Sequence, residues 1–239
     1  MLSVDRISKS FRGLKAVSQA SFDVPAGSIV ALIGPNGAGK TTCFNMIAGV
    51  FPPDSGRILF QDSPIQHLRP DQVCVAGIGR TFQIVKPFAG LSVLDNVMVG
   101  GFLKEKTVSG ARKISMEILG KLHLESKADL PASSLTLPDR KRLEVARALA
   151  TRPRLLLLDE VMAGLRPTEC DLIVQVFREL NRSDGLTILL IEHVMRAVMA
   201  LAQNVVVLHH GEIIARGAPA AVVRDPAVLE CYLGEETEV

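Results

Sequence analysis

A glycine-rich segment near the start of the chain has the residue types and spacing of a phosphate-binding loop. It reads Gly34-Pro35-Asn36-Gly37-Ala38-Gly39-Lys40-Thr41-Thr42 and fits the pattern G-x-x-x-x-G-K-[ST]. The glycines let backbone N–H groups surround a phosphate at a helix N-terminus, where Lys40 can reach the outer phosphate oxygens and the Thr41 hydroxyl can bind Mg²⁺. An apolar run before the loop and a helical pattern after it argue against the alternative, a simple glycine-rich turn. We therefore predict that the chain binds a nucleoside triphosphate with Mg²⁺.

A second apolar run, Leu155–Asp159, reads as a buried strand, and Glu160 follows it directly. Two carboxylates at the end of a buried strand are costly unless a cation lies near them. An acidic strand end that simply faces solvent is the alternative. Since neighbouring strand residues point to opposite sides, Asp159 can address the Mg²⁺ beside Thr41, while Glu160 can orient and deprotonate an attacking water.

His193 follows a third apolar run, Thr187–Ile191. Parallel strands present their carboxyl ends to ligands, so this histidine is a candidate γ-phosphate contact. A helix cap or a core histidine is the alternative. The remaining histidines lack such a context and are expected to be structural: His67, His123, His209 and His210.

The segments that must position these residues alternate between strand and helix. Two strand-like segments open the chain and suggest an antiparallel pair, and the middle of the chain has helical periods. The predicted strands are Leu2–Phe11, Lys15–Val24, Ile29–Ile33, Arg57–Phe60, Leu155–Asp159, Thr187–Ile191 and Asn204–Leu208, with a hairpin at His210-Gly211. The predicted helices are Lys40–Ala48, Val93–Met98, Ala111–Leu122, Arg140–Leu149, Thr168–Asn181 and His193–Ala202. This order predicts an α/β fold with a parallel sheet, interrupted by a helical insertion.

Composition excludes several other classes. The chain has 239 residues, 48% apolar and 22% charged, with a net charge of +2, so it can form a large core and lacks the basic excess typical of nucleic-acid binding. No apolar run approaches the ~18–20 residues that span a bilayer, and no secretory signal is visible, so we expect a cytoplasmic protein. Cys43, Cys74, Cys170 and Cys231 form no C-x-x-C pair and are expected to be thiols without a metal.

Taken together, five motifs in their order and spacing resemble the ATP-binding cassette of ABC transporters. They are Gly34–Thr42, Arg80–Gln83, Leu143–Leu149, Leu155–Glu160 and Ile191–His193. The resemblance covers nearly the whole chain and implies one ABC ATPase domain, residues 1–239. The P-loop NTPase (RecA-like) core, with an antiparallel β subdomain, would consist of residues 1–85 and 151–239. An inserted α-helical subdomain would consist of residues 86–150.

Within that family, the chain resembles the ATPase subunits of branched-chain amino-acid importers and their urea- and amide-transporting relatives. The segments that carry this are Arg80-Thr81-Phe82-Gln83, Ala163-Gly164-Leu165, Ile191–Met195 and the ending Asp225–Val228 with Tyr232–Glu235. The resemblance implies that Phe11 stacks on the adenine of ATP, that Gln83 touches Mg²⁺ and water, and that the surface from Gln83 to Leu91, with Ile84, Val85 and Phe88, faces a membrane subunit.

The implied partners are membrane-spanning permease subunits, a second ATPase subunit, and indirectly a periplasmic solute-binding protein, with no nucleic acid. The implied location is the cytoplasmic face of the plasma membrane, as a peripheral protein. One alternative is a soluble ABC ATPase that acts on nucleic acid or ribosomes, which usually has longer insertions or two cassettes. Another is a regulatory cassette that binds ATP without hydrolysing it.

Two departures from the family pattern bear on the dimer. The Leu-Ser-Gly-Gly-Gln signature, which caps the ATP of the opposite subunit, aligns with Leu135-Thr136-Leu137-Pro138-Asp139. Pro138 has no N–H to donate, Leu137 adds bulk, and Asp139 adds negative charge. The basic residues 140–142 could partly offset that charge. The alternative is that they form an exposed first turn of the helix. Arg166 stands where many members have Asp or Asn. These departures favour a heterodimer with an intact second cassette over a homodimer.

Overall fold

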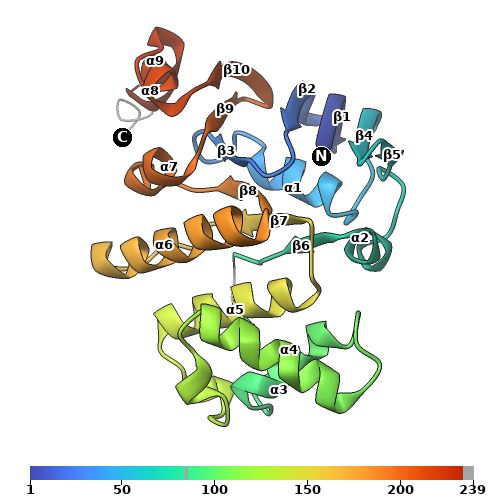
Figure 1. Ribbon diagram of the computed structural model, residues 1–239. Helices are drawn as coiled ribbons and strands as arrows, with labels where there is room; N and C mark the ends of the chain where they lie inside the picture. The colour runs from blue at the N-terminus through green and yellow to red at the C-terminus, as the bar shows by residue number, and fades with distance from the viewer. Residues whose placement is uncertain (84–85, 234–239) are drawn as a thin grey trace.

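The computed structural model describes residues 1–83 and 86–233, which form two sheets and a set of helices (Figure 1). The strands are β1 Leu2–Phe11, β2 Leu14–Val24, β3 Ile29–Ile33, β4 Ser55–Phe60, β5 Ser63–Pro64, β6 Ile78–Arg80, β7 Leu155–Asp159, β8 Thr187–Ile191, β9 Asn204–His209 and β10 Glu212–Gly217. The helices are α1 Lys40–Ile47, α2 Pro70–Ala76, α3 Val93–Gly101, α4 Val108–Lys121, α5 Leu137–Ala150, α6 Pro167–Asp184, α7 Met195–Leu201, α8 Pro219–Val222 and α9 Pro226–Leu233, with short 3₁₀ turns Glu125–Lys127 and Ala132–Ser134.

The larger sheet has six strands in the order β10-β9-β3-β8-β7-β6. Its strands β9, β3, β8, β7 and β6 pair in parallel, and β10 pairs antiparallel with β9 at one edge. Strands β3, β7 and β8 are buried along their whole length, as parallel strands covered on both faces must be, and this explains their near-continuous Leu, Ile and Val sequences.

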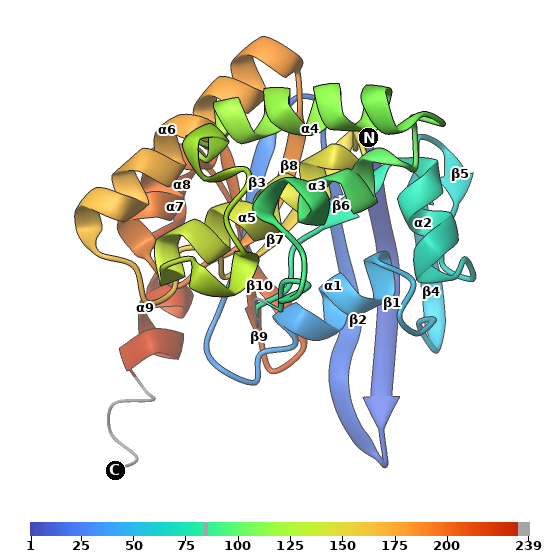
Figure 2. The same ribbon diagram turned by 90° about the horizontal axis from the view of Figure 1, so that it is seen from below.

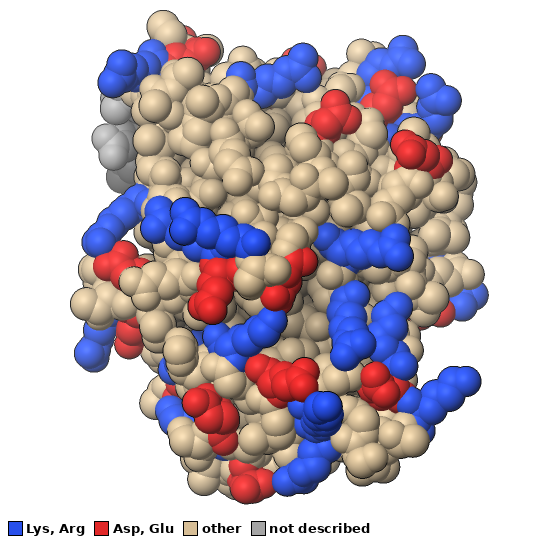
Figure 3. Space-filling view, viewed as in Figure 1, with Lys and Arg blue, Asp and Glu red and all other residues tan. Residues whose placement is uncertain are grey.

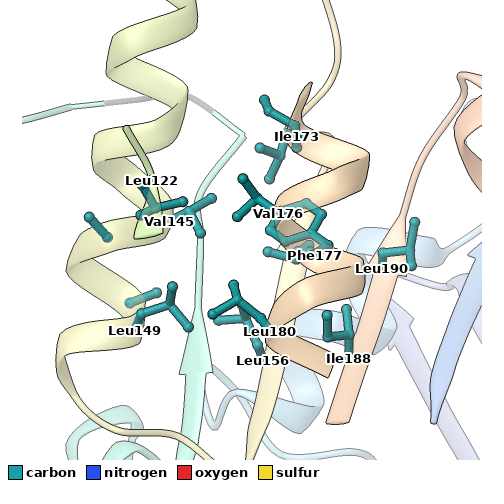
Figure 4. Close-up of a cluster of buried hydrophobic side chains, with 14 of the residues drawn as sticks. Leu122, Val145, Leu149, Leu156, Ile173, Val176, Phe177, Leu180, Ile188 and Leu190 are labelled. Carbon is teal, nitrogen blue, oxygen red and sulfur yellow. The ribbon is translucent and has the colours of Figure 1, made fainter. Parts of the chain in front are cut away.

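The two faces of this sheet belong to two different hydrophobic cores. On β3, Val30 and Leu32 pack with α1 and the four-stranded sheet, whereas Ile29, Ala31 and Ile33 pack on the opposite side. That second core joins the sheet to α6 and to the helical segment around α5 (Figure 4). The alternation follows from the two-residue period of a strand. One sheet therefore fixes the position of the parts on both of its sides.

The smaller sheet is antiparallel, in the order β2-β1-β4-β5, and it lies beside α1 (Figures 1 and 2). Helices α3, α4 and α5 pack against one another on the other side of the molecule. In the view of Figure 2 they lie in front of the β6–β7 end of the large sheet, with α6 beside them. The predicted α/β class, with a parallel sheet, an antiparallel sheet and a group of helices from the middle of the chain, is confirmed.

Several boundaries differ from the sequence-based expectation. Strand β6 and helix α2 were not predicted, because β6 has three residues and α2 has seven, too few to show a clear period. Helix α7 begins at Met195 rather than at His193, so His193 lies in the turn before it. Ile84, Val85 and residues 234–239, which include the end of the Tyr232–Glu235 motif, lie outside the described residues.

Candidate functional site

The predicted site residues follow four neighbouring strand ends. The glycine-rich loop follows β3, Gln83 follows β6, Glu160 follows β7 and His193 follows β8. Because β3 pairs with β8, β8 with β7 and β7 with β6 in parallel, these ends lie side by side at the carboxyl edge of the sheet. The fold thus brings together residues that are far apart in the sequence.

The loop between β3 and α1 is packed so closely that two of its glycines have no room for a side chain. A Cβ atom on Gly34 would lie 1.9 Å from the carbonyl oxygen of Leu208, and one on Gly39 would lie 2.4 Å from that of Ala16. Both glycines also have positive φ angles, 148° and 103°. The Lys40 ammonium lies inside the loop and donates to the carbonyl oxygens of Gly34 and Pro35, both at 2.7 Å. The loop is therefore preformed, with its cation in place.

Asp159 is buried beside Arg80. Asp159 Oδ2 accepts from Arg80 at 3.1 Å, and Asp159 Oδ1 is a buried oxygen with no hydrogen-bond partner within residues 1–83 and 86–233. Burial raises the pKa of Asp159 above its ordinary value, although the hydrogen bond and charge of Arg80 act in the opposite direction. An unpartnered buried carboxylate oxygen suits a bound cation, because a cation removes the cost of its burial.

The hollow around Asp159 also contains the other two residues expected to hold Mg²⁺. Thr41, Gln83 and Asp159 line one cavity of about 470 Å³, together with Arg80 and with groups from α5. Hydroxyl, amide and carboxylate oxygens are ligands that Mg²⁺ prefers. The residues present therefore fit this ion.

The carboxylate of Glu160 lies between Gln83 and His193. Gln83 Nε2 donates to Glu160 Oε2 at 2.7 Å, and His193 Nε2 lies 2.7 Å from Glu160 Oε1. The backbone of Glu160 has a φ of 49°, and its N–H donates to the Ile191 carbonyl at 3.0 Å. Asp159 and Glu160 thus have different neighbours, as expected, but Glu160 lies beyond the end of β7 in a left-handed backbone conformation rather than in the strand.

Phe11 lies at the end of β1, 43% exposed, in an edge-to-face contact with Phe51 at 5.3 Å between ring centroids. The ammonium of Lys9 lies over both rings, 5.8 Å from the Phe11 centroid, and is paired with Asp54. An exposed and laterally supported ring is available for stacking on a base.

The segment that replaces the signature begins α5. Leu137 is exposed, but Asp139 is 2% exposed and bonds Lys127, Arg142 and, at 2.9 Å, the Thr136 hydroxyl. Burial tends to raise the pKa of Asp139, but these bonds and charges lower it overall. The expectation that Asp139 adds negative charge toward a nucleotide was therefore wrong, because its carboxylate turns inward and is neutralised there.

The basic residues 140–142 are not an exposed turn either. Arg142 neutralises Asp139, Arg140 donates to the Ser133 carbonyl, and Lys141 is buried and donates to the backbone carbonyl of Glu160 at 3.0 Å. Arg166, at the second departure, is the N-cap residue directly before α6, and its backbone N–H donates to Glu169 at 2.8 Å.

Two groups that contact the site were not found by sequence reasoning. Glu192, next to His193, is 2% exposed and accepts from the Met162 N–H at 2.8 Å. Asn45 on α1 accepts from Arg80 at 2.7 Å. The polar residue in the otherwise apolar segment Cys43–Ile47 was the one available signal for Asn45.

The chain has a P-loop beside a buried acidic strand end on a parallel sheet, and an antiparallel sheet and a helical segment lie at the sides of that sheet. This arrangement defines a nucleotide-hydrolysing ATP-binding cassette. Sequence comparison agrees, since the profile of the ABC transporter family matches residues 17–163, well over half of the chain. The chain belongs to this family, and it binds and hydrolyses ATP. A second profile, that of the branched-chain amino acid ATP-binding cassette transporter, matches residues 212–238.

Curated relatives include ATP-binding proteins of several transport systems. The chain is 36% identical to the high-affinity branched-chain amino acid transport ATP-binding protein LivG of Escherichia coli, over 98% of both chains. It is 35% identical to BraF of Pseudomonas aeruginosa, of the same description, again over 98% of both. It is also 35% identical, over 98% of both, to the lipopolysaccharide export system ATP-binding protein LptB of E. coli. These relatives give no support to the alternative of a nucleic-acid or ribosome ATPase.

Solved structures show the same fold. The ADP conformation of MJ1267, an ATP-binding cassette of an ABC transporter, superposes with a TM-score of 0.89 at 31% identity, over 98% of both chains. The structure of cbiO1 from Clostridium perfringens superposes with a TM-score of 0.86 at 28% identity, over 100% of this chain and 98% of that one.

Proposed function

We propose that this ATPase drives a bacterial importer for branched-chain amino acids or a related small polar solute such as urea or an amide. LivG and BraF support this substrate class, and so does the branched-chain profile over residues 212–238. LptB is nearly as similar, and its export system is the second candidate. The importer is favoured because the second matching profile is named for the branched-chain amino acid cassettes.

For the chemical step, the observation that carries the proposal is the position of the Glu160 carboxylate between Gln83 and His193. Glu160 takes a proton from a water whose oxygen forms a bond to the γ-phosphorus, while the bond from that phosphorus to the ADP oxygen breaks. Gln83 orients the water, and His193 holds the carboxylate and contacts the γ-phosphate. Lys40 and the N–H groups of the loop hold the phosphates.

Mg²⁺ fits the group formed by Thr41, Gln83 and Asp159, which line one cavity. When bound there, it neutralises charge on the phosphate oxygens. Phe11, with its exposed ring, stacks on the adenine.

The membrane partner docks on the surface next to this cavity. Phe82, Phe88 and Leu91 are exposed, at 57%, 46% and 38%, and Phe82 also lines the cavity with Gln83. Exposed apolar side chains in one region are typical of an interaction surface. Basic and acidic side chains are mixed over the face of the molecule seen in Figure 3. No helix in the described part of the chain has the length and apolar character to cross a bilayer. The protein would therefore be held at the cytoplasmic face of the plasma membrane by permease subunits and reach the periplasmic binding protein only through them.

The catalytic assignment is tested with Glu160→Gln in the full chain. The variant keeps the shape of the side chain and one acceptor oxygen but cannot take a proton, so turnover should fall by at least ~10² while ATP affinity is retained. Lys40→Ala should lose binding itself. The matched control is Glu179→Gln, an exposed glutamate on α6, which should change neither. An equal loss of binding and turnover in Glu160→Gln would refute the assignment.

The substrate class is tested by reconstituting the chain with its permease subunits and binding protein in proteoliposomes. Import of labelled leucine or urea that depends on ATP supports the proposal. ATP-dependent extraction of lipopolysaccharide instead would favour the export candidate.

A further inference from the structure

A largely buried arginine connects three elements beneath the predicted metal site. Arg80, at the end of β6, donates through one terminal nitrogen to Asp159 Oδ2 at 3.1 Å and through the other to Asn45 Oδ1 on α1 at 2.7 Å. The side chains of Arg80 and Asp159 are only 11% and 3% exposed. The planar guanidinium matches this task, because its two terminal nitrogens hold a fixed fork geometry that a lysine cannot reproduce.

This pairing leaves the two oxygens of Asp159 in different states. Oδ2 is occupied by Arg80, whereas Oδ1 is buried without a hydrogen-bond partner within the described residues. Asp159 also lines the same cavity as Thr41 and Gln83. The ion pair therefore fixes which oxygen remains for a cation and supplies a positive charge to the carboxylate when no cation is bound.

We propose that Arg80 is a positioning residue and internal counter-ion for the metal-binding aspartate. It holds Asp159 with Oδ1 toward the cavity, and it reduces the dependence of ATP binding on Mg²⁺. The inference rests on the proposed role of Asp159 as a Mg²⁺ ligand.

The charge of Arg80 should act on nucleotide binding in two opposite ways. Without Mg²⁺, Arg80 screens the triphosphate from the negative charge of Asp159, so its loss should weaken ATP binding. With Mg²⁺, Arg80 partly neutralises the carboxylate of Asp159, so its loss should partly strengthen the attraction between Asp159 and the ion. The ratio of the ATP dissociation constant in EDTA to that in MgCl₂ should therefore rise, by roughly tenfold for unit charges several ångströms apart near a protein surface.

The experiment measures ATP dissociation constants of the full chain by calorimetry, in excess EDTA and in saturating MgCl₂. Arg80→Gln should raise the ratio about tenfold, whereas Arg80→Lys, which keeps the charge but loses the fork geometry that positions Asp159, should raise it by less. The matched control is Arg69→Gln, which removes an exposed arginine paired with Asp71 and should not change the ratio. Thermal unfolding without nucleotide verifies that each variant is folded.

A shift of both dissociation constants by the same factor in Arg80→Gln would show a merely structural role and overturn the inference. If Arg80→Gln does not fold, the double variant Arg80→Gln/Asp159→Asn is compared with Asp159→Asn alone. The inference requires equal ratios in these two variants, since Arg80 acts through the charge of Asp159, and unequal ratios would overturn it.

Asp159→Asn alone separates this inference from the proposed function. If it keeps the wild-type Mg²⁺ dependence, Asp159 is not the metal ligand, and both the assignment and the inference fail. If it loses that dependence while Arg80→Gln keeps the wild-type ratio, only the inference fails.

Discussion

Glu192 offers a stability test whose size can be worked out from its surroundings. Its Oε1 accepts from the Met162 N–H, and its Oε2 is buried with no hydrogen-bond partner in the described part of the chain. The pKa of Glu192 is raised from its ordinary value of 4.5 to about 7, because burial and the nearby Glu160 raise it more than the Met162 hydrogen bond and the charge of Lys141 lower it. The folded protein therefore binds this proton more tightly than the unfolded chain does.

The sign follows from proton linkage. A group with a raised pKa stabilises the folded state fully below its unfolded pKa, and this contribution is lost as the pH rises through the folded value. Between about pH 4.5 and 7, the shift corresponds to a loss of about 3 kcal/mol. Glu192→Gln keeps the acceptor for Met162 and cannot ionise, so it should escape this loss.

The assay is urea unfolding of the wild type and Glu192→Gln at several pH values between 5 and 8. The unfolding free energy of the variant minus that of the wild type should increase by about 3 kcal/mol across this range. A constant cost of burying the extra amide hydrogens cancels in this comparison, as does every other titrating group. Glu179→Gln, exposed on α6, is the matched control and should give no pH trend. A difference that stays constant with pH for Glu192→Gln would refute the reasoning.

Three further predictions address the dimer, the membrane and the helical segment. Asp139→Asn should lower the unfolding free energy in urea by about 1–3 kcal/mol, because Arg142 and Lys127 lose their charged partner. A loss under about 0.5 kcal/mol would contradict a stabilising role of these pairs. Phe88→Asp should release the chain from permease-containing membranes while ATP binding in solution is unchanged, and undiminished membrane association would count against this docking surface. The isolated chain should hydrolyse ATP slowly, and Leu137→Gly/Pro138→Gly, which leaves Asp139 in its ion pairs, should speed the slow site of the assembled dimer by about 10². Full transporter-level activity of the unaltered chain alone, with both sites equivalent in single-turnover measurements, would contradict this asymmetry.

The parts of the fold that the sequence predicts well are those with strong local patterns. Strands β3, β7 and β8 match their predicted bounds because each is a short, uninterrupted apolar run that ends at a loop. The glycine-rich loop and the acidic strand end carry their chemistry within a few consecutive residues. For this reason the class of ligand could be predicted without any knowledge of tertiary contacts.

The ion pairs at the site could not be predicted, since they depend on tertiary register. Arg80 and Asp159 are 79 residues apart, and they meet only because the three-residue strand β6 pairs with β7. Asp139 was expected to face a nucleotide, because the motif alignment says nothing about which way a side chain turns. The structure places Lys127 and Arg142 around it, and burial beside two cations costs less than burial alone.

Three acidic residues at this edge of the sheet are stabilised in three different ways, and this difference separates their functions. Asp159 is neutralised by Arg80 and keeps one oxygen for a cation. Glu160 lies between the side chains of Gln83 and His193 at the reaction site, with one oxygen beside each. Within residues 1–83 and 86–233, Glu192 has no hydrogen-bond partner for one oxygen, and its raised pKa favours a bound proton. The same change from carboxylate to amide should therefore have three different effects. It should remove the Mg²⁺ dependence of ATP binding at Asp159, ATP turnover at Glu160, and a pH-dependent loss of stability at Glu192. If any two of these substitutions gave the same phenotype, the corresponding carboxylates would share one role, and their separate surroundings would have no functional meaning.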